Sequence, residues 1–245
     1  MQSSRATRSS PKESSMKFGI IGSGNIGSTL ARHLVRAGHQ VTVANSRGPQ
    51  SLRELTAETG ASAGTVDEAV QGADIVVVSV PQKATPALAN AFAALGADTI
   101  VIDTNNYYPS RDGRIAALDD GQVESEWVAA QLGRPVIKAF NNIVAPSLLE
   151  KAALPGAPGR LALSVAGDSP AAREQVLRIV DQIGFDPVDA GPLSESWRQQ
   201  PGTPCYCKDY GAAAMKKSLA EADHARVAAY RSQADDAARP YFTSR

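Results

Sequence analysis

Three glycines near the start of the chain have the spacing of a phosphate-binding turn. Gly22, Gly24 and Gly27 form a G-x-G-x-x-G pattern directly after the apolar residues 18–21. In such a pattern the first glycine permits a tight turn, the second lets a pyrophosphate approach the backbone, and the third lets a helix pack close to the strand. The N–H groups at the helix start also attract phosphate. We therefore predict that a dinucleotide binds at Gly22, Ser23, Gly24, Asn25, Ile26 and Gly27.

The residues after the next apolar run indicate which dinucleotide binds. Residues 41–44 are followed by Asn45, Ser46 and Arg47. NAD-binding proteins place a carboxylate near this point for the ribose 2′-hydroxyl, and a carboxylate would repel a 2′-phosphate. Asn45 is uncharged, and an arginine can pair with a phosphate bidentately and stack on adenine. We predict NADP(H) rather than NAD(H), with Arg47 at the 2′-phosphate and Asn45 and Ser46 also at the cofactor; the alternative is that Arg47 is a solvated turn residue.

Polar residues also follow three later apolar runs. The runs at 75–80, 99–103 and 135–140 end in a proline or in asparagines: Pro81, Asn105, Asn106, Asn141 and Asn142. Carboxyl ends of parallel strands meet at the edge of a sheet where ligands bind. Amides there can bond a nicotinamide carboxamide or a ribose without adding charge, although asparagine also favours turns for structural reasons. As a set, we interpret these residues as the rim of a ligand cleft.

No side chain is assigned a catalytic role. Hydride transfer between stacked rings requires contact geometry and exclusion of water more than acid–base groups. A carbonyl or imine substrate would require a proton donor. The nearest candidates are Tyr107, Tyr108, Lys138 and Asp103, each of which we interpret as structural. The chain has no Tyr-x-x-x-Lys pair, which argues against the short-chain reductase mechanism.

The histidines and cysteines do not have the spacing of a metal site. His33, His39 and His224 are far apart, and we expect the first two to be solvated or to cap a helix. Cys205 and Cys207 lack a second ligand pair, so zinc is not expected. We interpret both as structural thiols of a cytoplasmic protein.

The order of apolar runs and helical patterns predicts the fold. Strand, glycine turn, helix and strand follow one another over residues 18–44, and short strands alternate with helices as far as residue 190. We predict an α/β, Rossmann-type doubly wound and mainly parallel sheet with a small helical C-terminal lobe. The expected parts are a disordered tail at 1–15, an NADP-binding Rossmann domain at 16–190 and a helical lobe at 191–245.

Within this plan, the later part of the chain predicts one more β-α-β unit. Residues 161–166 and 185–188 read as strands, and the helix between them is capped by Asp168 or Ser169. We expect this unit to extend the same sheet. The alanine-rich residues 212–229 predict one helix that packs on the cleft or on a second subunit.

Composition excludes some classes of partner. Twenty-five cationic residues balance twenty-five acidic ones among 245, so no general attraction to nucleic acid or to an anionic membrane is expected. No apolar run approaches the roughly 20 residues that cross a bilayer. Residues 1–15 are serine-rich and lack the apolar segment of a secretion signal. We therefore predict a cytoplasmic protein.

Four segments resemble a known family. They are residues 18–49 (FGIIGSGNIGSTLARHLVRAGHQVTVANSRGP), 76–81 (VVVSVP), 136–143 (VIKAFNNI) and 167–193 (GDSPAAREQVLRIVDQIGFDPVDAGPL). Together they resemble the F420-dependent NADP oxidoreductase family, and they are similar to the cytoplasmic domains of six-transmembrane ferric reductases. The resemblance covers residues 16–210.

The resemblance implies a Rossmann fold, NADP(H) binding and a homodimer. It implies that Val80 and Pro81 line the nicotinamide and that Ala139, Phe140 and Asn141 lie beneath a second ligand. In the named enzymes a hydride passes between the nicotinamide and a deazaflavin or flavin. The deazaflavin enzymes carry a histidine in the segment that corresponds to residues 140–142, and this chain has none.

The predicted function is that of an NADP(H)-dependent oxidoreductase. Its second ligand would be coenzyme F420, a flavin or a small carbonyl-type substrate. The alternative is a non-catalytic NADP(H)-binding sensor on the same fold, because a fold alone does not determine chemistry.

Overall fold

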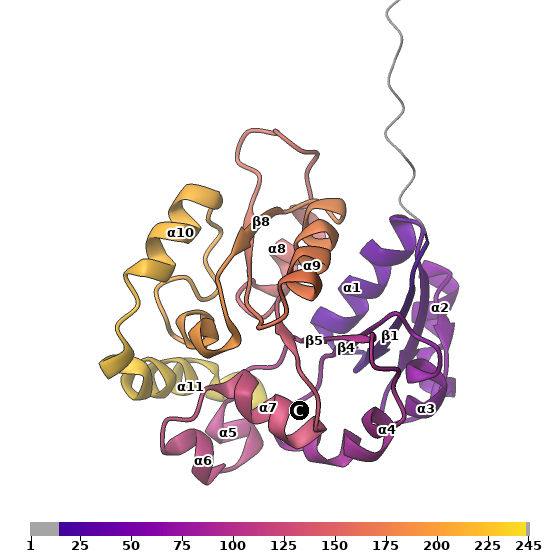
Figure 1. The fold of residues 1–245 in the computed structure, drawn as a ribbon, viewed down its shortest axis with the longest axis horizontal. Coiled ribbons are helices and arrows are strands. Elements are labelled where there is room, and N and C mark those ends of the chain that lie inside the picture. The colour runs from indigo at the N-terminus through magenta and orange to yellow at the C-terminus, as the bar shows by residue number, and fades with distance from the viewer. Residues whose placement is uncertain (1–14, 244–245) are drawn as a thin grey trace, which may run out of the picture.

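The structure, a computed structural model, describes residues 15–243. The predicted tail at 1–15 lies outside the described residues, apart from Ser15. Six strands form one sheet in the order β3-β2-β1-β4-β5-β6, and every neighbouring pair is parallel (Figure 1). The strands are β1 (Lys17–Ile21), β2 (Gln40–Ala44), β3 (Ser62–Ala63), β4 (Ile75–Val78), β5 (Ile100–Asp103) and β6 (Ile137–Lys138).

Helices cover both faces of this sheet. The alternation along β4 shows the two faces, because Ile75 and Val77 belong to one apolar cluster and Val76 and Val78 to the other. The first cluster includes residues of α1 (Asn25–Arg36), α8 (Ala145–Glu150) and α9 (Pro170–Gln182). The second includes residues of α3 (Val66–Val70), α4 (Ala89–Ala93) and α7 (Glu124–Leu132). A parallel sheet buried on both faces is the predicted Rossmann-type doubly wound fold, which is confirmed.

The strand order reverses between β1 and β4. The chain passes outward from β1 through β2 to β3, and then returns to place β4 on the other side of β1. Connections on opposite sides of this point leave a crevice at the carboxyl ends of the two strands, where ligands bind in open α/β sheets. The glycine turn after β1 and the Val80–Pro81 segment after β4 therefore lie at the same crevice.

The prediction that the later β-α-β unit extends this sheet is wrong. The strands β7 (Ala162–Val165) and β8 (Asp186–Asp189) form a separate two-stranded parallel sheet. Its link to the large sheet is one antiparallel bridge between Lys138 and Ala166. β6 is only two residues long, and the chain turns away at Phe140, whose φ is 62°. The outermost strand of the large sheet, β6, is therefore too short to pair with a full strand.

Other element bounds differ from the predictions by a few residues. The run at 75–80 ends as a strand at Val78, and the run at 135–140 is a strand only at Ile137–Lys138. The helix expected at 83–94 is a 3₁₀ helix at Gln82–Leu88 followed by α4. Pro86 lies inside that 3₁₀ segment and has no N–H to donate. Ser169 rather than Asp168 caps α9, since its side chain accepts from Ala172 N–H.

The C-terminal region is helical, as predicted, but the single helix expected at 212–229 is interrupted. α10 (Ala212–Ala220) ends before Asp223, whose side chain caps a new turn, and α11 (Val227–Thr243) follows. α10 packs on β7 and β8, and α11 lies along α5 (Pro109–Asp112), as Figure 1 shows in yellow and magenta. The remaining helices are α2 (Arg53–Thr59) and α6 (Ala116–Asp119). Within the described part of the chain, no helix is long and apolar enough to span a bilayer.

Candidate functional site

The three glycines of the turn after β1 lack a side chain for different reasons. A Cβ on Gly22 would lie 1.9 Å from Ser79 O, and a Cβ on Gly27 would lie 2.0 Å from Gly22 O. Gly22 also has a φ of 111°, which residues with a side chain rarely adopt. A Cβ on Gly24, by contrast, would meet nothing within 4 Å. The fold therefore requires the first and third glycines, whereas the second leaves an open approach to the backbone.

The start of α1 faces this opening with unpaired donors. Gly24 is the N-cap, and neither a capping side chain nor an acidic residue lies in the first turn. The N–H groups of Asn25, Ile26 and Gly27 precede the first hydrogen bond of the helix, from Ser28 N–H to Gly24 O. Unpaired N–H groups and the helix dipole favour an anion at this point. The residues present thus fit a dinucleotide pyrophosphate.

Asn45 organises the end of β2 and connects it to the glycine turn. Its Nδ2 donates to Ser23 Oγ and to Ser51 Oγ, both at 2.9 Å. Its Oδ1 accepts from Arg47 N–H at 2.9 Å. These bonds hold Ser23, at the phosphate turn, and the backbone of Arg47 in fixed relation to one another. Sequence reasoning identified the position of Asn45 but not this network.

Arg47 and Ser46 are exposed beside the turn. The Arg47 guanidinium makes no hydrogen bond or ion pair with any residue from 15 to 243. Other arginines of the described chain are paired with a carboxylate, as Arg32 is with Glu58 at 2.6 Å. An unpaired guanidinium at the end of β2 is available for a phosphate and does not have to give up an internal partner first.

The ends of β4 and β5 form one wall of the crevice. Val80 N–H donates to Asn105 Oδ1 at 3.0 Å, and Asn105 Nδ2 donates to Thr85 Oγ1 at 3.3 Å. Asn105 is 3% exposed, so its amide is used to hold Val80 and the following Pro81 in place. Val80 is half-buried and Pro81 is exposed. The predicted site residues at these strand ends are therefore neighbours, with Asn105 supporting the other two.

The end of β6 lies beside the end of β5. Asn106 Nδ2 donates to Asn141 O at 2.9 Å, and Asn141 Nδ2 donates to Asn106 Oδ1 at 3.0 Å. Ala139, Phe140 and Asn141 are all buried, and the Phe140 ring lies in the apolar core. Phe140 can therefore approach a ligand only through its backbone.

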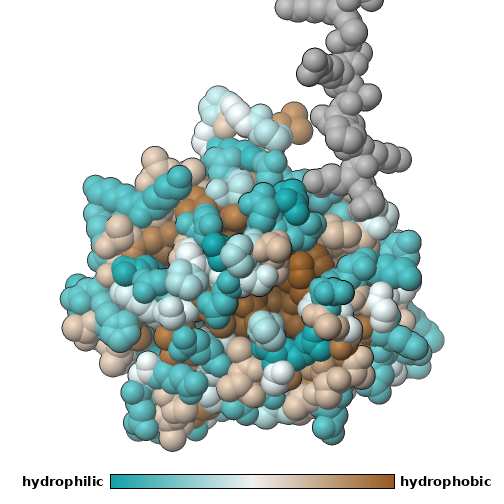
Figure 2. Space-filling model, in the orientation of Figure 1, coloured by the Kyte–Doolittle hydropathy of each residue, from teal (hydrophilic) through white to brown (hydrophobic). Residues whose placement is uncertain are grey.

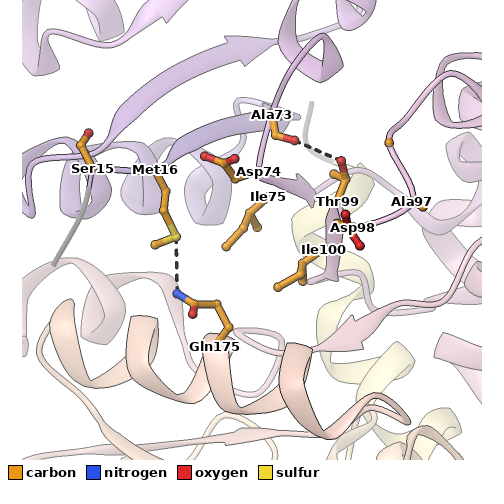
Figure 3. A pocket seen from close by; sticks show the side chains of 11 residues that line it. Ser15, Met16, Ala73, Asp74, Ile75, Ala97, Asp98, Thr99, Ile100 and Gln175 are labelled. Atoms are coloured by element: carbon orange, nitrogen blue, oxygen red, sulfur yellow. Dashed lines mark hydrogen bonds between the residues drawn. The ribbon is translucent and has the colours of Figure 1, made fainter.

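A hollow lies at the opposite edge of the sheet. It has a volume of about 540 Å³ and lies at the amino ends of β1, β4 and β5, near α9 (Figure 3). Its apolar part includes Met16, Ile75 and Ile100, and Figure 2 shows apolar residues gathered at this point of the face. The strands are about 15 Å long at roughly 3.3 Å per residue, so this hollow is separate from the glycine turn. We assign no ligand to it.

Comparison with known proteins agrees with this geometry. The family model for coenzyme F420-dependent NADP oxidoreductases matches residues 17–107. The crystal structure of hypothetical protein SMa0349 from Sinorhizobium meliloti is 31% identical, with a TM-score of 0.68, over 79% of this chain and 94% of that one. The chain belongs to the coenzyme F420-dependent NADP oxidoreductase family.

Two further similarities accompany that assignment. The metalloreductase STEAP3 of Rattus norvegicus is 31% identical over 189 residues, which are 76% of this chain and 36% of that protein. A structure from Arthrobacter sp. FB24, provisionally assigned as an F420-dependent NADP reductase, is 23% identical over 74% of this chain and 87% of that one, with a TM-score of 0.60; it supports the fold. The chain spans 21% to 55% of the lengths of the curated relatives that it matches.

Three of the four candidate proton donors of this family member are buried and therefore cannot reach a ligand. Asp103 and Lys138 are fully buried and paired with each other at 3.0 Å. Ser125 Oγ also donates to Asp103 at 2.9 Å, and the Lys138 ammonium donates to Asn105 O. Tyr107 is buried as well, and its hydroxyl lies 3.1 Å from Asp119 Oδ1. These groups hold β5, β6 and their loops together, and their structural interpretation agrees with this geometry.

A buried carboxyl group that the sequence did not single out lies beneath the same edge. Glu124 is fully buried at the start of α7, and its Oε2 accepts from Tyr107 N–H at 3.1 Å. Burial raises the pKa of Glu124 to about 7, although Lys138 and Arg231 oppose the shift. Nothing in the local sequence distinguishes Glu124 from an exposed glutamate, because the groups around its carboxyl, Tyr107 N–H and Arg231 of α11, come from distant parts of the chain.

His33 and His39 hold elements together and are buried, so the expectation that they are solvated is wrong. His33 is 4% exposed and its Nε2 lies 2.7 Å from Leu148 O, which ties α1 to α8. Burial lowers the pKa of His33. His39 is 6% exposed between Met16 N–H and Gln182. No group of three or more metal-binding side chains occurs among residues 15–243.

Proposed function

We propose that this chain is an NADP(H)-dependent oxidoreductase that transfers a hydride between the nicotinamide and a second ligand. The observation that carries the proposal is the opening at Gly24, which the fold itself does not require, at the unpaired start of α1. Membership of an oxidoreductase family with this fold supports it.

The residues after β2 favour NADP(H) over NAD(H). A 2′-phosphate beside Asn45 would meet no carboxylate from that position, and the unpaired Arg47 would supply charge-assisted hydrogen bonds. The exposed Ser46 hydroxyl would add a further donor. The 2′-phosphate is therefore the group by which this site would distinguish NADP(H) from NAD(H).

The remaining predicted site residues would position the reacting ring. NADPH, when bound, supplies a hydride to an acceptor carbon. Val80 and Pro81, held by Asn105, would bound the nicotinamide, and the end of β6 at residues 139–141 would bound the second ligand. That ligand would be coenzyme F420, a flavin or a small carbonyl-type substrate. A cytoplasmic location and a homodimer remain part of the proposal, and the two free thiols, Cys205 and Cys207, are consistent with a reducing compartment.

A calorimetric titration of the wild-type chain and of Arg47→Ala with NADPH and NADH tests the cofactor assignment. A hydrogen-bonded charge pair of this kind contributes about 1.5–3 kcal/mol. We therefore expect the variant to bind NADPH about 10- to 100-fold more weakly and NADH almost unchanged.

Arg178→Ala is the matched control. Arg178 is a partly exposed arginine on α9 that pairs with Glu174 within its own helix. Its removal should leave both affinities unchanged. Equal losses of NADPH and NADH in Arg47→Ala would contradict the assigned role, and no heat with either nucleotide would contradict the function.

A further inference from the structure

Two tyrosine hydroxyls meet near the edge of the sheet where β5 and β6 end. Tyr108 Oη lies 2.5 Å from Tyr206 Oη, and the side chain of Cys207 interacts with the Tyr206 hydroxyl. All three residues are half-buried. Cys207, Tyr206 and Tyr108 form what we term the hydroxyl relay.

Hydrogen bonds attach the relay to the end of β6. Cys207 N–H donates to Asn142 O at 2.9 Å. On the other side, Asn106, two residues before Tyr108, donates to Asn141 O at 2.9 Å. The relay therefore continues the polar wall that the proposed function places beneath the second ligand.

The same place carries backbone strain and an unpartnered polar atom. Phe140 and Cys207, with φ of 62° and 53°, are the two non-glycine residues between 15 and 243 with a positive φ. Such strain is unfavourable and gathers at functional sites. The Oδ1 atom of Asn141, a residue that is 3% exposed and bonded to Asn106, has no hydrogen-bond partner in the described chain. Buried polar atoms normally have one, so this atom indicates a polar ligand or ordered water.

Tyr108 differs from the other proton-bearing groups of this edge in being half-buried and not fully buried. Asp103, Lys138 and Tyr107 are fully buried. Either hydroxyl can donate in the Tyr108–Tyr206 contact; when Tyr206 donates to Tyr108, the Tyr108 proton is available to a ligand. The ring of Tyr108 is fixed by Phe242, with centroids 5.3 Å apart, and by the guanidinium of Arg111.

We propose that Tyr108 donates a proton to a carbonyl or imine group of the second ligand, and that Tyr206 and Cys207 resupply it. This inference rests on the proposed function, because it concerns the ligand of the same site. It selects a C=O or C=N acceptor over a stacked deazaflavin or flavin ring, since transfer between stacked rings would not require such a relay.

The step balances as follows. The π bond of the C=O or C=N group breaks as its carbon accepts the hydride that NADPH supplies, and the electron pair moves to oxygen or nitrogen. That atom takes the Tyr108 hydroxyl proton, Tyr206 reprotonates Tyr108, and Cys207 or solvent reprotonates Tyr206. The sum consumes one NADPH and one proton and yields NADP⁺ and an alcohol or amine.

The relay remains in the protonated form that a donor requires. Burial raises the pKa of Tyr108 to about 12 and the pKa of Tyr206 above its usual range. Burial also raises the pKa of the Cys207 thiol. Near neutral pH each of the three groups therefore holds its proton until an acceptor develops negative charge.

Tyr108→Phe tests the proposal, because it removes the hydroxyl and keeps the ring that packs on Phe242. The variant and the wild type are compared for NADPH affinity, for binding of the unreactive carbonyl compound isobutyramide to the NADPH complex, and for reduction of aldehydes, ketones and cyclic imines. We expect unchanged NADPH affinity, weaker isobutyramide binding, and a fall in kcat of about 100-fold or more. Tyr206→Phe should also lower kcat, but should weaken isobutyramide binding less than Tyr108→Phe does. Tyr241→Phe, at a side chain that is 75% exposed, is the control and should behave as wild type.

The outcomes separate this inference from the proposed function. If NADPH does not bind the wild type, both fail. If NADPH binds and is oxidised by flavin or coenzyme F420 but by no carbonyl or imine, the function stands and the inference is overturned. If carbonyl reduction and isobutyramide binding are undiminished in Tyr108→Phe, the inference is overturned as well.

Discussion

The second and third glycines of the turn illustrate how one residue type can answer two physical requirements. A Cβ at position 27 would collide with Gly22 O at 2.0 Å, so Gly27 is required for α1 to pack on β1. Gly24 has a φ of −70° and open space around it, so an alanine fits there without strain. The fold explains the absence of a side chain at position 27, and we propose that a ligand explains it at position 24.

Alanine substitutions at these two positions should therefore separate binding from stability. Gly24→Ala should lower the unfolding free energy by only about 0.5–1 kcal/mol, the difference between glycine and alanine at an N-cap, and should weaken NADPH binding strongly. Gly27→Ala should destabilise the fold by several times as much. Urea unfolding and NADPH titration measure the two effects, and a Gly24→Ala protein with normal NADPH affinity would refute the ligand explanation.

Local sequence context was enough to place some residues of the candidate site at the ends of their strands. Asn45 and Arg47 could be placed because they stand at a fixed distance from the glycines in a β-α-β unit. The pairing of Tyr108 with Tyr206 could not, because 98 residues separate them and their contact depends on how the loop after η3 (Leu193–Gln199) folds back. The burial of Glu124 was missed for the same reason.

At the level of elements, a buried charge links α7 to α11. Glu124 Oε1 lies 3.7 Å from Arg231 Nε, and Arg231 Nη1 donates to Leu118 O at 2.7 Å. Three atoms of this pair nevertheless have no hydrogen-bond partner in the described chain: Glu124 Oε1, Arg231 Nε and Arg231 Nη2. The carboxylate is thus incompletely compensated, which explains why burial dominates its pKa.

The stability of the protein should therefore fall as Glu124 ionises. Its pKa is raised from 4.5 to about 7 in the folded state, so the folded state holds the proton more tightly than the unfolded one. The stabilisation is complete below the unfolded value and is lost as the pH rises through the folded value. It amounts to about 3 kcal/mol. Urea unfolding at about pH 5 and about pH 8 should show this loss in the wild type.

Glu124→Gln should remove that part of the pH dependence, since an amide does not ionise. Glu126→Gln, on the same turn of α7, is the matched control and should retain it. The same pH dependence in the wild type and in Glu124→Gln would show that other groups cause it.

The sequence indicated most elements of the sheet but not their full arrangement. Continuous β-branched runs such as residues 75–78 predict buried parallel strands reliably, because no other element buries such residues on both faces as easily. The length of β6 and the separate β7–β8 sheet could not be predicted. They follow from the turn at Phe140 and from packing of α10 on β7 and β8, and both are tertiary features.

At the scale of the whole molecule, the two edges of the six-stranded sheet differ in character. The carboxyl edge brings together the open glycine turn, the unpaired Arg47, the amide rim and the hydroxyl relay. The amino edge carries a hollow with an apolar floor of Met16, Ile75 and Ile100. The chemistry of the protein is therefore expected at one edge only. The homodimer remains a prediction.

The most direct test of the account is a turnover measurement on protein with NADPH demonstrably bound. The absorbance of NADPH is followed after addition of coenzyme F420, free flavin, or a panel of aldehydes, ketones and cyclic imines. The account predicts oxidation of NADPH by at least one of these three classes, at a rate that falls with Arg47→Ala when NADPH is below saturation. NADPH that stays bound and unoxidised with every acceptor would contradict it and would favour a nucleotide sensor.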